Sequence, residues 1–450
     1  MISEKTVKLV TSVPGPKSLE FDAQRRQYIS SGVGIAFGIY VAEAKDALIK
    51  DVDGNVFIDM AAGFGVQNAG HCDEEVVKAI QIQAARYIHP SFQVTPYPEY
   101  IELAKRLCEL TPGKFPKKVM FANSGSEAVE NAVKIAKRYT GKQGIVSLEA
   151  AFHGRTYMAM GLTSKVKPYK NGMGPFPSEL YKMPGPYCYR CEFGSTYPEC
   201  GLACVEKFRT LLKAEWSADN LAAVIAEPVQ GEGGFIVPPK DYFTALSKIC
   251  QENKILLIID EVQAGFGRTG RMFASENFDL EPDLMTLSKS IAAGVPLSGV
   301  VGRAEVMDGV NKGEIGGTYG GSPLACVASL KVIDKMIEQH LPERAVVIGQ
   351  KLLDKGFEFK EKFDFVGDVR GIGAMVGYEF VKDPVTKEPN EQAVDYIINY
   401  CLQKGVLLIS AGLFHSVIRF LPPLVITDEQ LAYVLKTLEE AMVDYAISDQ

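Results

Sequence analysis

Residues 255–262 read Ile-Leu-Leu-Ile-Ile-Asp-Glu-Val, five apolar residues that end at two carboxylates. A continuous apolar run of this length, bounded by polar residues, is typical of a strand buried on both faces of a sheet. Similar runs lie at 117–123, 144–152, 221–229 and 283–289, and helical patterns alternate with them. This alternation predicts an α/β fold in which helices cover both faces of a mostly parallel sheet.

The two ends of the chain follow a different pattern. Near the start, short apolar runs flank Asp53-Gly54, a pair that suits a two-residue hairpin loop. After Ser322 a long helical pattern leads to short strands, which predicts a smaller α+β domain. We predict an N-terminal segment that contributes to the small domain (1–65), a large domain (66–330) and a C-terminal small domain (331–450).

The composition favours work on small molecules. The 450 residues include 55 acidic and 48 basic side chains, for a net charge of -7, and they form no dense basic block of the kind that binds nucleic acid. The first residues do not resemble a secretory signal, and no apolar run approaches the length of a membrane span. We therefore expect a cytoplasmic protein that contacts neither nucleic acid nor membrane.

Polar residues of special type follow several predicted strands, where ligands of open parallel sheets bind. Asn123-Ser124-Gly125-Ser126 joins a strand to a helix, so free amides and a close backbone could cradle a phosphate. Simple N-capping by Ser124 is the structural alternative. Asp260 ends a buried strand, where a carboxylate is costly unless paired, and could bind the ring nitrogen of a pyridine cofactor. Its structural alternative is a helix cap or an ion pair.

Lys289 closes another apolar strand and is followed by small residues. Such surroundings remove hydration and favour the neutral amine that a Schiff base requires, although a lysine at a strand end is more often a surface residue. In AFHGRT, Phe152 and His153 are flat side chains that could stack on a ring, and Arg155 could bind a carboxylate. Core packing is the structural alternative for these aromatic side chains.

Other residues are ambiguous by themselves. Glu227, Glu232 and Arg419 could form surface ion pairs. Gly265, Gly267 and Gly270 spell GxGxxG, but five residues separate them from the strand and no helical pattern follows directly, so we do not predict dinucleotide binding.

Taken together, NSGSEAVENAVKIAK, AFHGRT, EPVQGEGG, DEVQAGFGRTG, LSKS and GGTYGGSPLAC closely resemble the class III (subgroup II) aminotransferases, with 4-aminobutyrate aminotransferases as the nearest members. The resemblance spans nearly the whole chain. It implies fold type I, a homodimer with a shared active site or a higher oligomer built from it, and pyridoxal 5'-phosphate as the cofactor.

The resemblance also implies a role for each matching residue. Lys289 would carry the cofactor and transfer protons, Asp260 would pair with the pyridine nitrogen, and Gln263 would donate to the ring oxygen. Phosphate contacts would come from Gly125, Ser126 and Thr318 of the partner subunit. The ring would lie between Phe152 and Val262, beside His153. Substrate carboxylates would meet Arg155 and the switch pair Glu232 and Arg419, and Phe64 departs from the aliphatic or Tyr side chain that members often carry near the substrate.

A second departure lies in the segment 173–204, a predicted insertion with Cys188, Cys191, Cys200 and Cys204. Paired spacing suits a tetrahedral zinc or a thiolate cluster, whereas free or disulfide-linked thiols in a surface insertion are the alternative. A metal-binding or interaction module built on these cysteines would leave the strand-end residues unexplained. We expect no catalytic metal.

The predicted reaction is transfer of an amino group from an ω-amino acid to 2-oxoglutarate, which gives a semialdehyde and glutamate. A pyridoxal-phosphate-dependent racemase or epimerase is the alternative, since the same cofactor supports both reactions. Arg155 together with Glu232 and Arg419 favours transfer, because an isomerase does not need to accept glutamate.

Overall fold

The computed structural model describes residues 2–448, which form two compact units. One unit extends from Glu74 to Ala345, and the other combines the residues up to Asp73 with those from Val346 onward. Our predicted division after residues 65 and 330 stays a prediction, since a contact unit and a family domain need not end at the same residue.

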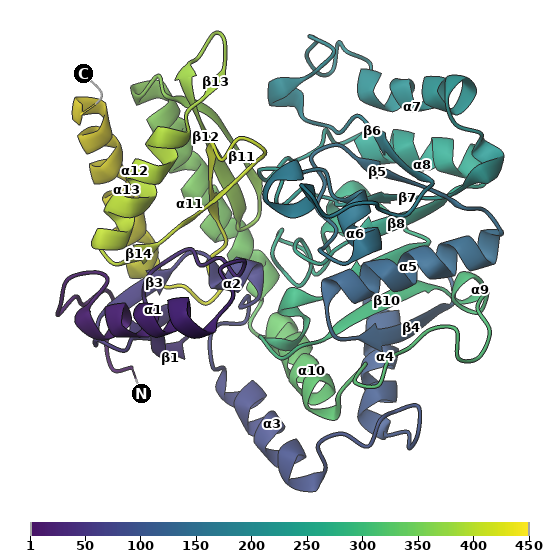
Figure 1. Ribbon diagram of the computed structural model, residues 1–450, viewed down its shortest axis with the longest axis horizontal. Coiled ribbons are helices and arrows are strands. Elements are labelled where there is room, and N and C mark those ends of the chain that lie inside the picture. Colours follow the sequence, from purple (N-terminus) through teal and green to yellow (C-terminus); the bar gives the residue numbers. More distant parts are fainter. Residues whose placement is uncertain (1, 449–450) are drawn as a thin grey trace. The chain divides into compact units, whose positions relative to one another are not determined.

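The larger unit is built on a seven-stranded sheet of order β4-β10-β9-β8-β7-β5-β6 (Figure 1). Neighbours from β9 to β6 run parallel, while β10 is antiparallel to both β9 and β4. The strands are β4 (Lys117–Ala122), β5 (Gly144–Leu148), β6 (Leu180–Met183), β7 (Leu221–Ala226), β8 (Leu256–Asp260), β9 (Leu284–Leu287) and β10 (Ser298–Arg303).

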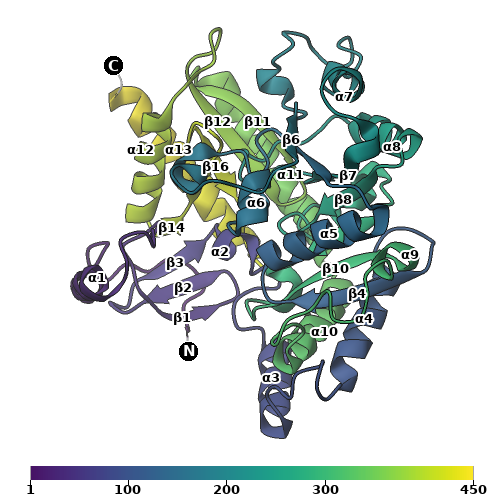
Figure 2. The same cartoon turned by 45° about the vertical axis from the view of Figure 1, so that its right-hand side comes forward.

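Successive residues of the central strands face opposite layers of helices. Ile258 packs in a core cluster with α5, whereas Ile259 packs in a second cluster with α7 and α8. Figure 2 shows α5 and α8 on either side of the strands. The helices of this unit are α3 (Glu74–Arg86), α4 (Pro98–Leu110), α5 (Gly125–Thr140), α6 (Tyr157–Leu162), α7 (Ala203–Ala214), α8 (Tyr242–Glu252), α9 (Ala304–Met307) and α10 (Pro323–Glu338). The apolar runs of the sequence are thus strands buried between two helical layers, as predicted.

The smaller unit contains two sheets, of order β1-β2-β3-β14 and β11-β12-β16-β15, with β13 paired to β12. Its strands are β1 (Val41–Lys45), β2 (Leu48–Asp51), β3 (Val56–Asp59), β11 (Val366–Ile372), β12 (Met375–Asp383), β13 (Glu388–Pro389), β14 (Val406–Leu407), β15 (Ile409–Ala411) and β16 (Val417–Phe420). Its helices are α1 (Pro16–Tyr28), α2 (Ala62–Gly65), α12 (Glu391–Gln403) and α13 (Asp428–Ser448), and the division between the units falls within α11 (Leu341–Lys362).

The predicted hairpin around Gly54 is confirmed, because β2 and β3 pair antiparallel. Its loop is longer than the predicted two residues, since β2 ends at Asp51 and β3 begins at Val56. The reason is the carboxylate of Asp51, whose Oδ1 accepts the N–H groups of Asp53 and Asn55 and thereby orders the wider turn. Within the described residues, no helix has both the length and the apolar character to cross a bilayer.

Candidate active site

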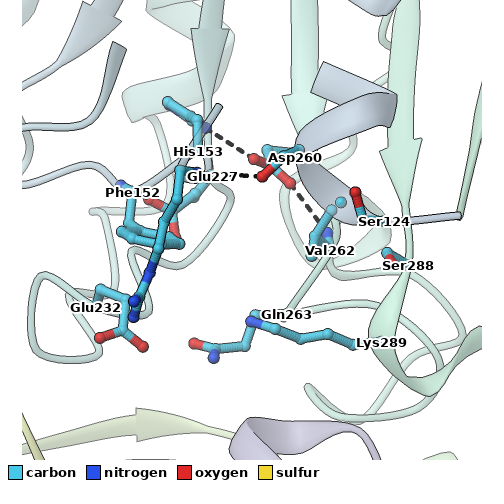
Figure 3. A pocket seen from close by; sticks show the side chains of 14 residues that line it. Ser124, Phe152, His153, Glu227, Glu232, Asp260, Val262, Gln263, Ser288 and Lys289 are labelled. Carbon is cyan, nitrogen blue, oxygen red and sulfur yellow. Dashed lines mark hydrogen bonds and ion pairs between the residues drawn. The ribbon is translucent and has the colours of Figure 1, made fainter. Parts of the chain in front are cut away.

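A cavity of about 320 Å³ opens in the larger unit, where the carboxyl ends of β7, β8 and β9 meet the start of α5 (Figure 3). This is the position at which open parallel sheets bind ligands. The residues that line it are Ser124, Gly125, Ser126, Phe152, His153, Gly154, Arg155, Glu227, Glu232, Asp260, Val262, Gln263, Ser288 and Lys289. Ten of the residues predicted from the sequence are therefore brought together in one place.

Three donors hold the Asp260 carboxylate at the end of β8. Oδ1 accepts the Val262 N–H at 3.1 Å and the Thr286 hydroxyl at 3.0 Å, and Oδ2 lies 2.7 Å from Nδ1 of His153. The carboxylate is only 4% exposed, so these contacts offset the cost of its burial. The sequence suggests that His153 could stack on a ring. The contact that the structure shows for its side chain is the one from Nδ1 to the Asp260 carboxylate.

The start of α5, where the sequence predicts an anion cradle, lines the cavity. Ser124 is also an N-cap, because its hydroxyl accepts the Glu127 N–H while the Glu127 carboxylate accepts the Ser124 N–H. The capping alternative is therefore confirmed, and the anion cradle at the same helix end stays a prediction. A Cβ on Gly125 would lie 2.9 Å from a methyl group of Val262, so only glycine lets the backbone come this close.

Lys289 follows β9 and Ser288, with a backbone φ of 48°. This left-handed conformation is unfavourable for a side chain other than Gly, Asn or Asp, and it persists only where the surroundings impose it. The Ser288 hydroxyl donates to the Leu297 carbonyl at 2.9 Å, which fixes the residue before the lysine. The alternative that Lys289 is a surface residue is excluded, because Lys289 lines the cavity.

Phe152 and Arg155 enter the cavity from the segment after β5, and both contact Tyr169. The Phe152 and Tyr169 ring centroids are 5.0 Å apart, and the Arg155 guanidinium lies 4.7 Å from the Tyr169 centroid. Tyr169 belongs to a π-helical turn, Val166–Lys170. One aromatic ring thus supports both an aromatic wall and a cationic group of the site.

Glu227 and Glu232 reach the cavity from the segment after β7. Glu227 is 7% exposed, and its two oxygens accept the N–H groups of Phe152 and Gly231, each at 2.9 Å. Burial, with a further contribution from Asp260, raises the pKa of the Glu227 carboxyl to about 8. The surface ion pair that the sequence allows for Glu227 is therefore wrong.

Three predicted residues are not among those that line the cavity. Thr318 is exposed, and its carbonyl accepts a hydrogen bond from Nε2 of His89 at 2.6 Å. Phe64 and Arg419 belong to the smaller unit, where the guanidinium lies 5.2 Å from the Phe64 ring centroid. Arg419 is 2% exposed, so it is not the surface residue that the alternative reading describes. The parts of these three residues in the reaction stay predictions.

Sequence reasoning missed two residues that support the site, Thr286 and Tyr169. Thr286 lies within the apolar run of β9, and a hydroxyl two or three residues before the lysine is the signal that could have marked it. Tyr169 lies in a turn without periodicity, so no sequence signal places it beside Arg155.

Two further sequence motifs, the GxGxxG glycines and the clustered cysteines, can be compared with the structure. Residues 263–269 form consecutive turns, in which Gly270 N–H bonds to the Gly267 carbonyl, so the glycines do not open a helix as a dinucleotide fingerprint would. Across residues 2–448 the structure contains no disulfide bond and no group of three or more His, Cys, Asp or Glu side chains arranged to hold a metal ion.

The cavity fits a phosphorylated pyridine aldehyde. It offers an amine at Lys289, a fixed carboxylate at Asp260 and a helix start at Gly125 around one cavity. These match the aldehyde, the ring nitrogen and the phosphate of such a cofactor in turn.

Comparisons with known proteins agree with this chemistry. The family described as aminotransferase class-III matches residues 28–442. A probable 4-aminobutyrate aminotransferase of Bacillus subtilis is 46% identical over 98% of this chain and 100% of its own length. A 5-aminovalerate aminotransferase of Pseudomonas aeruginosa is 42% identical over 94% of this chain and 98% of its own. An amine transaminase from an uncultivated Pseudomonas species, solved in its PLP-bound form, superposes with a TM-score of 0.86 at 29% identity, covering 93% of this chain and 98% of that one.

Proposed function

The chain belongs to the class III aminotransferases, which have fold type I and depend on pyridoxal phosphate, and from that premise we propose that it transfers the amino group of 4-aminobutyrate or a similar ω-amino acid to 2-oxoglutarate. The observation that carries this proposal is the cavity in which Lys289, Asp260 and the start of α5 meet. Relatives that act on 4-aminobutyrate or 5-aminovalerate, as their names state, support an ω-amino donor.

When bound, the cofactor supplies an electron sink for the carbon that carries the amino group. The other steps belong to this chain's residues. Asp260, which contacts His153, Thr286 and the Val262 N–H, would pair with the ring nitrogen. The Lys289 amine would hold the cofactor, and as a free base it would take a proton from, or return one to, the carbon that bears the amino group.

Positioning is divided among the other lining residues. Gly125 and Ser126 would bind the phosphate through the free amides of α5, Phe152 and Val262 would enclose the ring, and Gln263 would donate to the ring oxygen. Arg155 would bind the substrate carboxylate distal to the reacting amine. Glu232 would pair with Arg419 while an ω-amino donor is bound and would release it for the α-carboxylate of glutamate.

We also propose a homodimer in which Thr318 of the partner subunit completes the phosphate site. Thr318 is followed by Tyr319, which is 64% exposed, and His89 bonds to the Thr318 carbonyl while its ring lies 4.9 Å from the Tyr319 ring. Ile88 and Val94 nearby in sequence are exposed as well. Apolar side chains gathered in this way are typical of an interface between chains.

We further propose a cytoplasmic location. The buried thiols of Cys250, Cys326 and Cys401 support a reducing compartment, the cytoplasm.

The test is a donor panel with the purified holoenzyme. 4-Aminobutyrate, 5-aminovalerate, β-alanine, ornithine and L-alanine are each incubated with 2-oxoglutarate, and glutamate is measured. We expect the highest kcat/KM for 4-aminobutyrate or 5-aminovalerate, and absence of glutamate from every ω-amino donor would overturn the proposal. Formation of a D-amino acid from an L-amino acid alone would instead support a racemase.

The role of Lys289 is tested with the variant Lys289→Ala. We expect turnover to fall at least about a thousandfold, since both the attachment of the cofactor and the proton transfer are lost. The visible absorption of the protein-bound cofactor should change as well. A variant that keeps both the spectrum and turnover would remove Lys289 from the mechanism.

A further inference from the structure

Glu227 lines the cavity, although the proposed reaction assigns it no step. It directly follows β7, and each of its carboxyl oxygens accepts one main-chain N–H, Oε1 from Phe152 and Oε2 from Gly231. The two N–H groups come from chain segments that are far apart in sequence. One carboxyl group therefore ties the segment after β5 to the turn after β7.

The turn that begins at Gly231 has little freedom to move. Gln230 and Ile236 exchange two main-chain hydrogen bonds, and the N–H groups of Gly234 and Phe235 return to the Gly231 carbonyl. A Cβ on Gly231 would lie 1.8 Å from Oε1 of Gln263. A shift of this turn by a fraction of an ångström would thus displace either Gln263 or Glu232, the next residue.

We propose that Glu227 is a positioning residue of the active site, which fixes Phe152 and the Gly231 turn and thereby sets where the cofactor ring and the Glu232 carboxylate lie. This inference rests on the proposed function and extends it to a residue without a chemical step. Figure 3 shows Glu227 beside Phe152 and His153, with Glu232 on the same side of the cavity.

The chemistry of the side chain supports a carboxylate at this position. A carboxyl group has two oxygens that can each accept an N–H whether or not it is protonated, since a hydroxyl oxygen also accepts, whereas an amide offers one oxygen and one amino group that cannot accept an N–H. Burial and the neighbouring Asp260 carboxylate make a charged group unfavourable here, so a residue with only a space-filling role would be apolar. The two N–H groups of Phe152 and Gly231 explain why an acidic side chain occupies this buried position.

The experiment compares Glu227→Gln with Asp283→Asn. Asp283 also accepts a main-chain N–H, from Leu257 at 2.9 Å, and an Arg303 contact at 2.8 Å, but it precedes β9 at the opposite ends of the strands. Three quantities are measured on each holoenzyme: the visible circular dichroism of the bound cofactor, KM and kcat for glutamate, and the midpoint of thermal unfolding.

For Glu227→Gln we expect an altered dichroism of the cofactor and a KM for glutamate raised about tenfold, with a smaller change in kcat, because a small misplacement weakens binding geometry first. Asp283→Asn should lower the unfolding midpoint and leave the other two quantities unchanged. Glu227→Asp keeps both oxygens but withdraws them by one methylene, so it should fold and show the same shifts to a smaller degree.

Two outcomes would overturn the inference: unchanged dichroism and KM in Glu227→Gln and Glu227→Asp, or equal changes of both in Asp283→Asn. Failure of the proposed function looks different. In that case the wild-type enzyme would produce no glutamate from the donor panel, while the dichroism of the bound cofactor would still report on Glu227.

Discussion

Neighbouring carboxylates at the end of β8 have separate tasks. Asp260 faces the cavity, whereas Glu261 accepts the N–H groups of Ala274 and Ser275 and the Ser275 hydroxyl at 2.6 to 2.9 Å. Burial raises the pKa of Glu261 to about 7. The place of Asp260 at the end of the buried strand suggests that it faces a ligand, but leaves a helix cap or an ion pair open, and the family pattern favours the first interpretation. Glu227 could not be predicted, since burial of a single acid after a strand leaves no periodic signal.

Lys182 is a buried amine whose titration should affect stability. Its Nζ donates to the Ser147 hydroxyl at 2.7 Å and to the Leu162 carbonyl. Burial, and secondarily Lys170, lowers the pKa of Lys182 from 10.5 to about 7. Between these values the unfolded chain binds a proton that the folded chain does not, so this group makes stability rise as the pH rises from about 7 towards 10.

We therefore expect Lys182→Met to remove this rise, which would be on the order of 3 kcal/mol. The measurement is the thermal unfolding midpoint of the wild-type and variant holoenzymes between pH 6.5 and about 9.5, taken as a difference so that other titrating groups cancel. Lys105→Met, which replaces an exposed lysine, serves as the control. A difference between Lys182→Met and wild type that does not vary with pH would contradict the expectation.

Among the elements, the parallel strands were the most predictable and the connections the least. β5, β7, β8 and β9 are predominantly apolar because both of their faces are covered. β10 was not predicted, since its sequence Ser-Gly-Val-Val-Gly-Arg is short and contains two glycines that weaken any strand pattern. Its place between β4 and β9 depends on pairing across the whole unit, which periodicity does not record.

The π-helical turn Val166–Lys170 illustrates how a connection can determine specificity, because its Tyr169 supports Arg155. We expect Tyr169→Leu to raise the KM for 2-oxoglutarate about tenfold with little change in kcat, as the guanidinium loses its aromatic neighbour. Tyr169→Phe keeps the ring and should behave as the wild type. Steady-state kinetics of both variants, combined with Arg155→Met in a double-mutant cycle, would test this. Additive effects of Tyr169→Leu and Arg155→Met would disprove the coupling.

At the scale of the whole molecule, the proposed dimer predicts complementation between subunits. Lys289→Ala and Thr318→Glu should each inactivate their homodimers, the second by placing a negative charge against the phosphate. A hybrid with one chain of each kind has one intact site, composed of Lys289 from one chain and Thr318 of the partner subunit. We expect about half of the wild-type activity from such a purified hybrid.

The hybrid is isolated with two different affinity tags and assayed beside both homodimers. If Thr318 acted within its own chain, neither site of the hybrid would be intact and it would be inactive. This outcome would leave the chemistry at Lys289 in place and remove only the shared site.

The place of β4 in the sheet determines when during synthesis of the chain the cofactor site can be completed. Within the described residues β4 has one strand partner, β10, which begins 176 residues after β4 ends, between Ala122 and Ser298. The ribosome must therefore synthesise about two-thirds of the chain before the strand that leads to Ser124 and Gly125 can be paired. Lys289 itself emerges only shortly before β10. We therefore expect the cofactor to bind late, after every strand of the large sheet has been synthesised.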